Sequence, residues 1–177
     1  MVTLIKNYFS GKIEKYLAEF VYGSIDGTVT TFAIIAGIAG ANLSSAIVVI
    51  LGFSNVLADG FSMASSNYLS EQSHQDQNPG EHHQEPLKTA LATFLSFITI
   101  GSIPVVSYIV AKYIPLFINH AFLFAMICTG ITFIGIGSVR GKISGAHPLR
   151  TSVETLVVGA IAAAVAYGVG AFLGNIL

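Results

Sequence analysis

Apolar residues occur along the chain in five long runs, and short polar stretches separate these runs. A helix needs about 20 predominantly apolar residues to cross the hydrocarbon core of a bilayer, and each run meets that length. The runs predict membrane-spanning helices at about 21–41, 43–69, 89–111, 116–139 and 151–177. The predicted fold class is all-α, a polytopic membrane protein with a five-helix transmembrane domain over 21–177.

The first 20 residues follow a different pattern. Apolar residues such as Ile5, Phe9 and Ile13 share one helical face, while lysines and glutamates occupy the rest. This pattern is typical of an amphipathic helix that lies at the membrane surface and leads into the first span. A helix that packs on a neighbouring copy of the chain fits the pattern equally well.

Composition supports the membrane class. Of the 177 residues, 53% are hydrophobic and only 10% are charged, whereas soluble domains have roughly 25% charged residues. The one cysteine, Cys128, excludes an internal disulfide framework.

The positive charges predict the orientation in the membrane. Seven of the eight lysines and arginines fall in the N-terminal segment, the loop after the second span and the loop after the fourth span; only Lys112 falls on the other side. Because cytosolic loops carry an excess of Lys and Arg, we expect a cytosolic N-terminus and a cytosolic polar loop over 70–88.

A polar stripe interrupts the second predicted span. Asn55, Asp59 and Met63 recur at intervals of four residues and therefore share one helical face. A carboxylate within hydrocarbon costs on the order of 2.5–3.5 kcal/mol, and such residues usually mark an ion or proton path. The stripe predicts that this helix lines a cation pathway.

A second carboxylate is expected beside Asp59. The short turn over 40–45 makes the first two spans an antiparallel hairpin, and Asp26 and Asp59 are equally distant in sequence from its midpoint. Both carboxylates should therefore lie at the same depth and form a pair. Alternatively, the two aspartates only hydrogen-bond Ser, Thr or backbone groups inside the bundle.

This set of groups suits a divalent metal ion. Carboxylate and amide oxygens suit Mg, Ca or Mn, and the Met63 thioether biases the set toward softer metals such as Fe(II). Crowded carboxylates such as Asp26 and Asp59 could release protons when metal binds and release metal when protonated, which is a chemical basis for antiport.

The polar loop over 70–88 contains further metal-ligand types. These are Glu71, His74, Glu81, His82, His83 and Glu85. Their spacing matches no recognised zinc module. The loop is either a solvated linker or a loose metal-collecting loop.

Three segments resemble the vacuolar iron transporter family: DGTVTTFAIIAGIAGA over 26–41, DGFSMASSNYLSEQS over 59–73, and ETLVVGAIAAAVAYGVGAFLG over 154–174. The resemblance implies a homodimer of five-helix protomers with an ion path between the copies. It also implies export of Fe²⁺ from the cytosol in exchange for protons, while the ligand chemistry leaves Mn²⁺ as a second possible cargo. The implied location is the inner membrane of a bacterium or a vacuolar-type membrane of a eukaryote.

Two positions of the predicted ion path match the family, and one differs. Asp26 and Met63 match the aspartate and methionine that family members place along the ion path. The family usually has glutamate where this chain has Asn55, and Asp59 lies one turn closer to Met63. The long Glu-rich cytosolic domain of many members is missing between the second and third spans, which indicates a compact member.

Two other classes remain as alternatives. Paired membrane aspartates also occur in aspartyl intramembrane proteases, but Ser-Ile-Asp-Gly and Ala-Asp-Gly are not the GxGD context of those enzymes. The other alternative is a membrane scaffold that transports nothing. We therefore expect a transporter and not an enzyme, with no resident cofactor and no nucleic-acid partner.

Overall fold

The structure is a computed structural model that describes residues 2–79 and 84–176, with side chains described from residue 16 onward. Its regular elements are helical: α1 (Val2–Gly40), α2 (Ser45–Gln77), α3 (Pro86–Gly101), α4 (Ile103–Val110), the 3₁₀ turn η1 (Ala111–Tyr113), α5 (Ala121–Ser144) and α6 (Pro148–Gly174).

Within the described residues, five helical segments are long and apolar enough to cross a membrane. They are Tyr16–Gly40, Ser45–Gln77, Pro86–Tyr113, Ala121–Ser144 and Pro148–Gly174. Large apolar side chains, including Ile50, Phe61 and Ile161, are exposed on the outside of the bundle. Such a surface suits lipid or another protein chain in place of water. The predicted all-α class is confirmed, and so is the presence of five helices long and apolar enough to cross a membrane.

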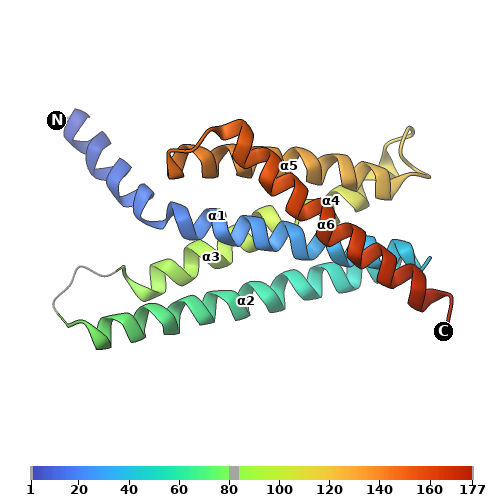
Figure 1. The fold of residues 1–177 in the computed structure, drawn as a ribbon, viewed down its shortest axis with the longest axis horizontal. Coiled ribbons are helices and arrows are strands. Elements are labelled where there is room, and N and C mark those ends of the chain that lie inside the picture. Colours follow the sequence, from blue (N-terminus) through green and yellow to red (C-terminus); the bar gives the residue numbers. More distant parts are fainter. Residues whose placement is uncertain (1, 80–83, 177) are drawn as a thin grey trace.

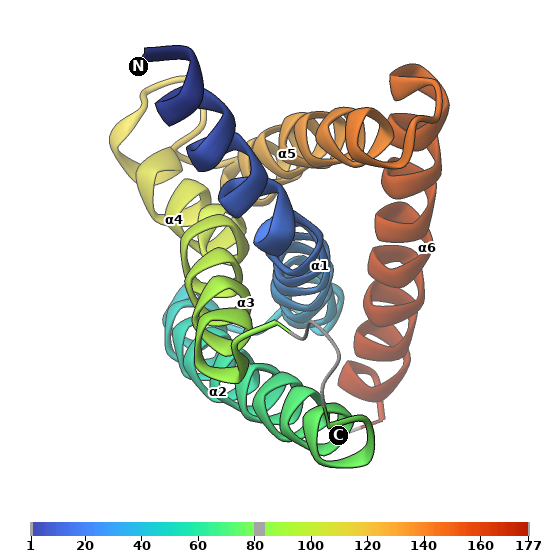
Figure 2. The same ribbon diagram turned by 90° about the vertical axis from the view of Figure 1, so that its left-hand side faces the viewer.

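Helix α1 lies at the centre of the bundle (Figure 2). The hairpin of α2 and α3 packs on one side of it, and α5 and α6 pack on the other. The first turns of α1 point away from the bundle (Figure 1). Helix α1 continues past Phe20 without a break. The position of the first 20 residues at the membrane surface stays a prediction.

Glycines let α1 approach α3 at backbone distance. A Cβ atom added at Gly27 would lie 3.0 Å from the carbonyl oxygen of Phe97, and one added at Gly101 would lie 2.9 Å from the Cα of Gly27. At Gly23, an added Cβ would lie 2.7 Å from the carbonyl oxygen of Thr93. The small-residue spacing at Gly23 and Gly27 therefore marks a helix contact, as expected in membrane bundles.

A second glycine contact joins α1 to α6. A Cβ at Gly174 would lie 2.8 Å from the Cα of Ala41, and a Cβ at Gly170 would overlap the carbonyl oxygen of Gly37. Both faces of α1 are thus held by close packing.

Several helix ends differ from the predicted spans. The second span was expected to end at Leu69, but α2 continues to Gln77 because no helix breaker occurs before Pro79. The third span is divided after Gly101, and Pro104 lies in the first turn of α4. Proline has no N–H to continue the hydrogen-bond ladder, which explains the division.

The fourth and fifth helices also have shifted ends. The fourth span was expected over 116–139, but Phe117 and His120 are part of hydrogen-bonded turns and α5 begins at Ala121. The helix continues past 139 to Ser144, where Gly145 adopts φ +67° and ends it. Helix α6 begins at Pro148, a favourable first-turn residue, instead of 151.

The α1–α6 contact predicts a position-specific loss of stability. Gly170→Leu should lower the thermal unfolding midpoint in detergent, because the side chain must displace the backbone of α1, at a cost of about 1–3 kcal/mol. Gly168→Leu is the matched control, because no atom lies within 4 Å of a Cβ at that position. Equal midpoints for the two variants would contradict the close packing.

Candidate functional site

The turn between α1 and α2 sets which side chains of the two helices meet. Leu43 donates its N–H to the carbonyl of Ile38 at 3.1 Å, and Asn42 adopts φ 53° to reverse the chain. Helix α2 then runs back along α1 and buries a regular stripe toward its neighbours: Val48, Gly52, Val56, Gly60 and Ala64. The polar residues of α2 therefore occupy the remaining faces.

Asp26 and Asp59 come together as expected from the hairpin. The two carboxylates are close enough to interact electrostatically. Asp26 is exposed on the surface of the single chain, and Asp59 is half-buried. Within the described residues, neither carboxylate accepts a hydrogen bond or joins a salt bridge. The Thr30 hydroxyl donates to the backbone carbonyl of Asp26 at 2.8 Å and not to its carboxylate.

Two further polar groups lie along the same hairpin toward the turn. The Thr31 hydroxyl on α1 and the Asn55 amide nitrogen on α2 are buried, and neither has a hydrogen-bond partner within the described part of the chain. Buried polar groups are normally satisfied by protein, water or an ion. Met63 lies on the other side of Asp59 and is half-buried. The stripe of Asn55, Asp59 and Met63 is therefore continuous along α2.

A polar pocket of about 330 Å³ lies beyond the aspartates, where α1, α2 and the start of α3 meet. We call it the acidic pocket, and its lining residues are Ala18, Glu19, Tyr22, Asn67, Ser70, Glu71, His74 and Thr89. Helix α2 has 33 residues, or about 50 Å at 1.5 Å per residue, and is longer than a bilayer core of about 30 Å. Glu71 and His74 can therefore lie outside the hydrocarbon while Asp59 lies within it.

Hydrogen bonds fix one wall of the acidic pocket. The Asn67 amide donates to the Thr93 hydroxyl at 2.7 Å, and Gln84 donates its backbone N–H to Glu71 Oε1 at 2.8 Å. Glu19 Oε2 is buried and has no hydrogen-bond partner within the described residues. The pocket thus offers carboxylate oxygens and an imidazole to a cation.

The predicted loop ligands fall into three groups. Glu71 and His74 line the acidic pocket. Glu85 lies apart from it and pairs with Lys88 at 2.6 Å. Glu81, His82 and His83 lie outside the described residues.

Sequence reasoning did not assign Glu19 to the site. The sequence pattern placed Glu19 on the polar face of an amphipathic N-terminal helix. Its spacing of seven residues from Asp26 was the signal that could have found it, because two turns separate residues on one helical face.

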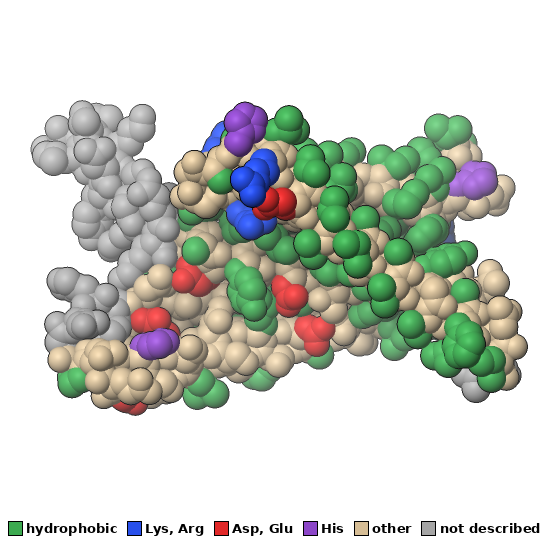
Figure 3. Space-filling model, in the orientation of Figure 1, with side chains coloured by type: hydrophobic (Ala, Val, Ile, Leu, Met, Phe, Trp, Pro, Cys, Tyr) green, Lys and Arg blue, Asp and Glu red, His purple; other side chains and the backbone are tan. Residues whose placement is uncertain are grey.

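Charges are segregated over the surface of the bundle. Figure 3 shows acidic side chains on the face formed by α1 and α2, and basic side chains around the α5–α6 connection. There Glu154 pairs with Arg150 at 3.0 Å and with Arg140 at 3.6 Å. Glu154 therefore belongs to a surface ion-pair group and not to the aspartate site.

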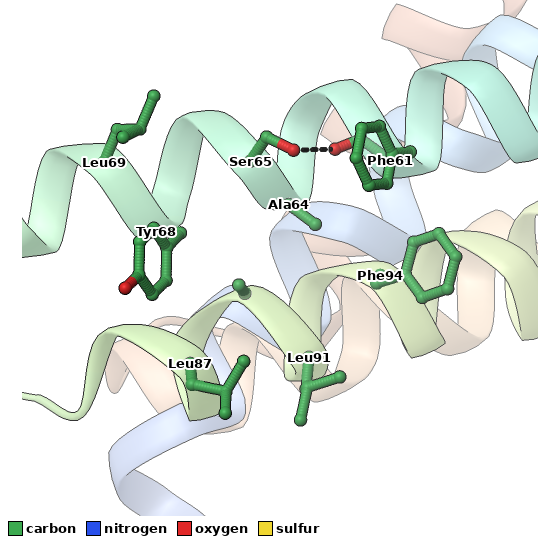
Figure 4. Close-up of a pocket in the computed structure, with 9 residues that line it drawn as sticks. Phe61, Ala64, Ser65, Tyr68, Leu69, Leu87, Leu91 and Phe94 are labelled. Carbon is green, nitrogen blue, oxygen red and sulfur yellow. Dashed lines mark hydrogen bonds between the residues drawn. The ribbon is translucent and has the colours of Figure 1, made fainter.

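The groove between α2 and α3 is separate from the aspartates and from the acidic pocket. It has a volume of about 430 Å³ and is lined by Phe61, Ala64, Ser65, Tyr68, Leu69, Leu87, Ala90, Leu91 and Phe94. The Ser65 hydroxyl turns back to the Phe61 carbonyl at 2.8 Å (Figure 4). A surface this apolar suits hydrocarbon and not a metal ion.

One chain alone does not surround an ion. Within residues 16–79 and 84–176, no group of three His, Cys, Asp or Glu side chains is close enough to hold a metal ion. The polar groups instead form a row along α1 and α2, which we call the polar route. It consists of Thr31 and Asn55 near the turn, Asp26 and Asp59 in the middle, and the acidic pocket at the far end.

The family model described as VIT family matches residues 17–85 and 77–171. These two parts together cover most of the chain, including every residue of the polar route. The chain belongs to the VIT family. The two parts overlap at 77–85, in the polar connection between α2 and α3, where long insertions of other members were expected.

Curated relatives are similar over most of the chain. The vacuolar iron transporter of Toxoplasma gondii is 26% identical, and the match covers 89% of this chain and 74% of the relative. Vacuolar iron transporter 1 of Arabidopsis thaliana is also 26% identical, covering 92% of this chain and 86% of the relative. The vacuolar iron transporter of Plasmodium falciparum is 36% identical over a shorter part, 39% of this chain and 25% of the relative.

Membership of the VIT family and the five apolar helices make the chain an integral membrane protein of a transporter family.

Proposed function

We propose that this VIT family member exports a divalent transition metal, Fe²⁺ or Mn²⁺, from the cytosol in exchange for protons. The observation that carries the proposal is the meeting of Asp26 and Asp59 on facing helices of the membrane domain. Two carboxylates in such surroundings repel each other, and a bound cation relieves that repulsion. The relatives named vacuolar iron transporters support iron as the cargo.

A second copy completes the proposed site. Asp26 is exposed on the single chain, so a two-fold partner that packs on this face can add its own Asp26 and Asp59. A cation between the copies would then meet carboxylates from both chains, with Met63 adding a soft sulfur. Two protons that take the place of the divalent metal leave the net charge of the site unchanged on the return step, which is the basis for antiport.

The polar route gives the proposed direction. With the N-terminus in the cytosol, the acidic pocket faces the cytosol, and Glu19, Glu71 and His74 attract the ion there without enclosing it. The ion then passes Asp26 and Asp59. The Thr31 hydroxyl and the Asn55 amide nitrogen, which lack hydrogen-bond partners in the described residues, lie between the aspartates and the hairpin turn. Water or the hydrated ion can satisfy them there.

Removal of the Asp59 charge tests the route. Asp59→Asn should lower metal flux into proteoliposomes by roughly 30-fold, which corresponds to about 2 kcal/mol for loss of a buried charge interaction. Asp76→Asn makes the same chemical change on an exposed part of α2 and should leave flux unchanged. Size-exclusion profiles check that both variants keep the assembly. Wild-type flux in Asp59→Asn would contradict the route, and no flux in the wild type would favour a scaffold.

The sulfur of Met63 should affect selectivity. Met63→Ala is expected to reduce Fe(II) transport more than Mn(II) transport, because the softer ion gains more from a thioether. The measurement is initial flux of each metal under the same pH gradient. Met126→Ala, a methionine on α5, serves as control and should change neither flux. Equal losses of the two metals in Met63→Ala would remove sulfur from the selectivity argument.

The acidic pocket should set apparent affinity and not maximal flux. Glu71→Gln combined with His74→Ala removes two of its ligands, so half-maximal flux should need about tenfold more metal, a loss of about 1.4 kcal/mol. The amide of Gln at position 71 can still accept the Gln84 N–H, which preserves the pocket wall. An unchanged affinity would mean that the acidic pocket does not collect the ion, and the segment over 70–88 would then count as a linker.

A further inference from the structure

A second polar pocket lies at the opposite end of the bundle, beside the hairpin turn. It has a volume of about 370 Å³ and lies between the start of α2, the end of α4 with η1, and the start of α5. Its polar lining side chains are Ser45, Tyr108, Lys112, Asn119 and His120. We call it the donor pocket, because every one of these side chains can donate a hydrogen bond.

The donor pocket contains a cation without a carboxylate. The sequence has no Asp or Glu over 27–58 or over 86–153, and these ranges include every segment that lines the pocket. Within the described residues, the salt bridges join Lys88, Arg140 and Arg150 to carboxylates at the other end of the bundle, and none includes Lys112. The Lys112 ammonium group is therefore left without an anionic partner in the described part of the chain.

The hydroxyl groups of the pocket are already positioned. Ser45 Oγ and Tyr108 Oη lie 3.3 Å apart and share one hydrogen bond, so the other hydroxyl hydrogen is free to reach a ligand. His120 and Asn119 are exposed at the rim, as is Lys112. The pocket therefore has a hydrogen-bonded pair of hydroxyls at its wall and exposed lysine, histidine and amide side chains at its opening.

Backbone dipoles add to the same polarity. Helices α2 and α5 begin at Ser45 and Ala121, and neither start has a side-chain cap that occupies its free N–H groups. The start of a helix carries a partial positive charge and favours anions. Side chains and backbone thus both favour negative charge in one cavity.

We propose that the donor pocket binds a phosphate-type oxyanion, either free inorganic phosphate or the phosphate of an anionic lipid headgroup. A tetrahedral oxyanion can accept hydrogen bonds from the Lys112 ammonium, His120 and the Ser45–Tyr108 pair at the same time. The pocket lies at an end of the membrane helices, where both sources are available. Binding does not depend on metal transport, so it can be tested separately.

Lys112→Ala tests the proposal. The full-length protein is purified in a maltoside detergent, which contains no phosphate, and inorganic phosphate is titrated by calorimetry. Loss of a charge-assisted hydrogen bond should weaken phosphate binding by about tenfold or more. His120→Ala should also weaken it, and Lys112→Arg should retain it. Lys142→Ala, which removes one positive charge at the far end of α5, should leave phosphate binding unchanged.

A second arm distinguishes the two sources. Phosphatidylglycerol is added to the micelles, and the lipid that stays bound after washing is measured by native mass spectrometry. Phosphatidylglycerol that displaces phosphate from the wild type, and is lost in Lys112→Ala, identifies the headgroup as the ligand. Phosphate binding without lipid retention identifies the free anion.

Three results would overturn the proposal. The first is a wild-type protein that binds neither phosphate nor phosphatidylglycerol, which would make Lys112 only an anchor at the membrane surface. The second is equal binding by the wild type and Lys112→Ala. The third is an equal loss in Lys142→Ala, because binding would then follow net charge and not this pocket.

Discussion

The close packing of α1 against its neighbours is the constraint on which the rest of the structure depends. Gly23 and Gly27 bring α1 to backbone distance from α3, and Gly40 and Gly170 bring it to backbone distance from α6. In a bilayer, where apolar surface is not driven together by water, such van der Waals contacts are a principal source of helix association. The position and rotation of α1 are therefore fixed, and so is the direction in which Asp26 projects.

A fixed α1 makes the carboxylate pair unavoidable. The hairpin turn determines which level of α2 lies beside Asp26, and the buried stripe of α2 determines its rotation, so Asp59 is held at the same level. Neither side chain has a hydrogen-bonding or ionic partner in the described residues that would neutralise it. The free energy of this arrangement improves when a cation or protons arrive, and this is the property a transport site needs.

Much of this site followed from the sequence, because it depends on regular geometry. The aspartate pair came from counting residues on each side of the turn between the first two spans. The ends of helices did not follow, since Gly145 ends α5 through a backbone conformation that apolar runs do not reveal. The acidic pocket was also only partly predictable. Glu71 and Glu85 look alike in sequence, yet within the described residues Lys88 pairs with Glu85 and not with Glu71.

The two polar pockets divide the molecule by charge. Glutamate side chains gather in the acidic pocket at one end of the α1–α2 hairpin, and the pocket at the other end is lined by hydrogen-bond donors, with no Asp or Glu side chain among its described lining residues. An acidic end raises the local concentration of cations, whereas a donor end repels them unless an anion is bound there. A metal ion that has passed Asp59 would then meet either a repulsive pocket or one neutralised by the proposed oxyanion. Under the proposed direction of transport, occupancy of the donor pocket would therefore set the electrostatic barrier at the end where the ion leaves.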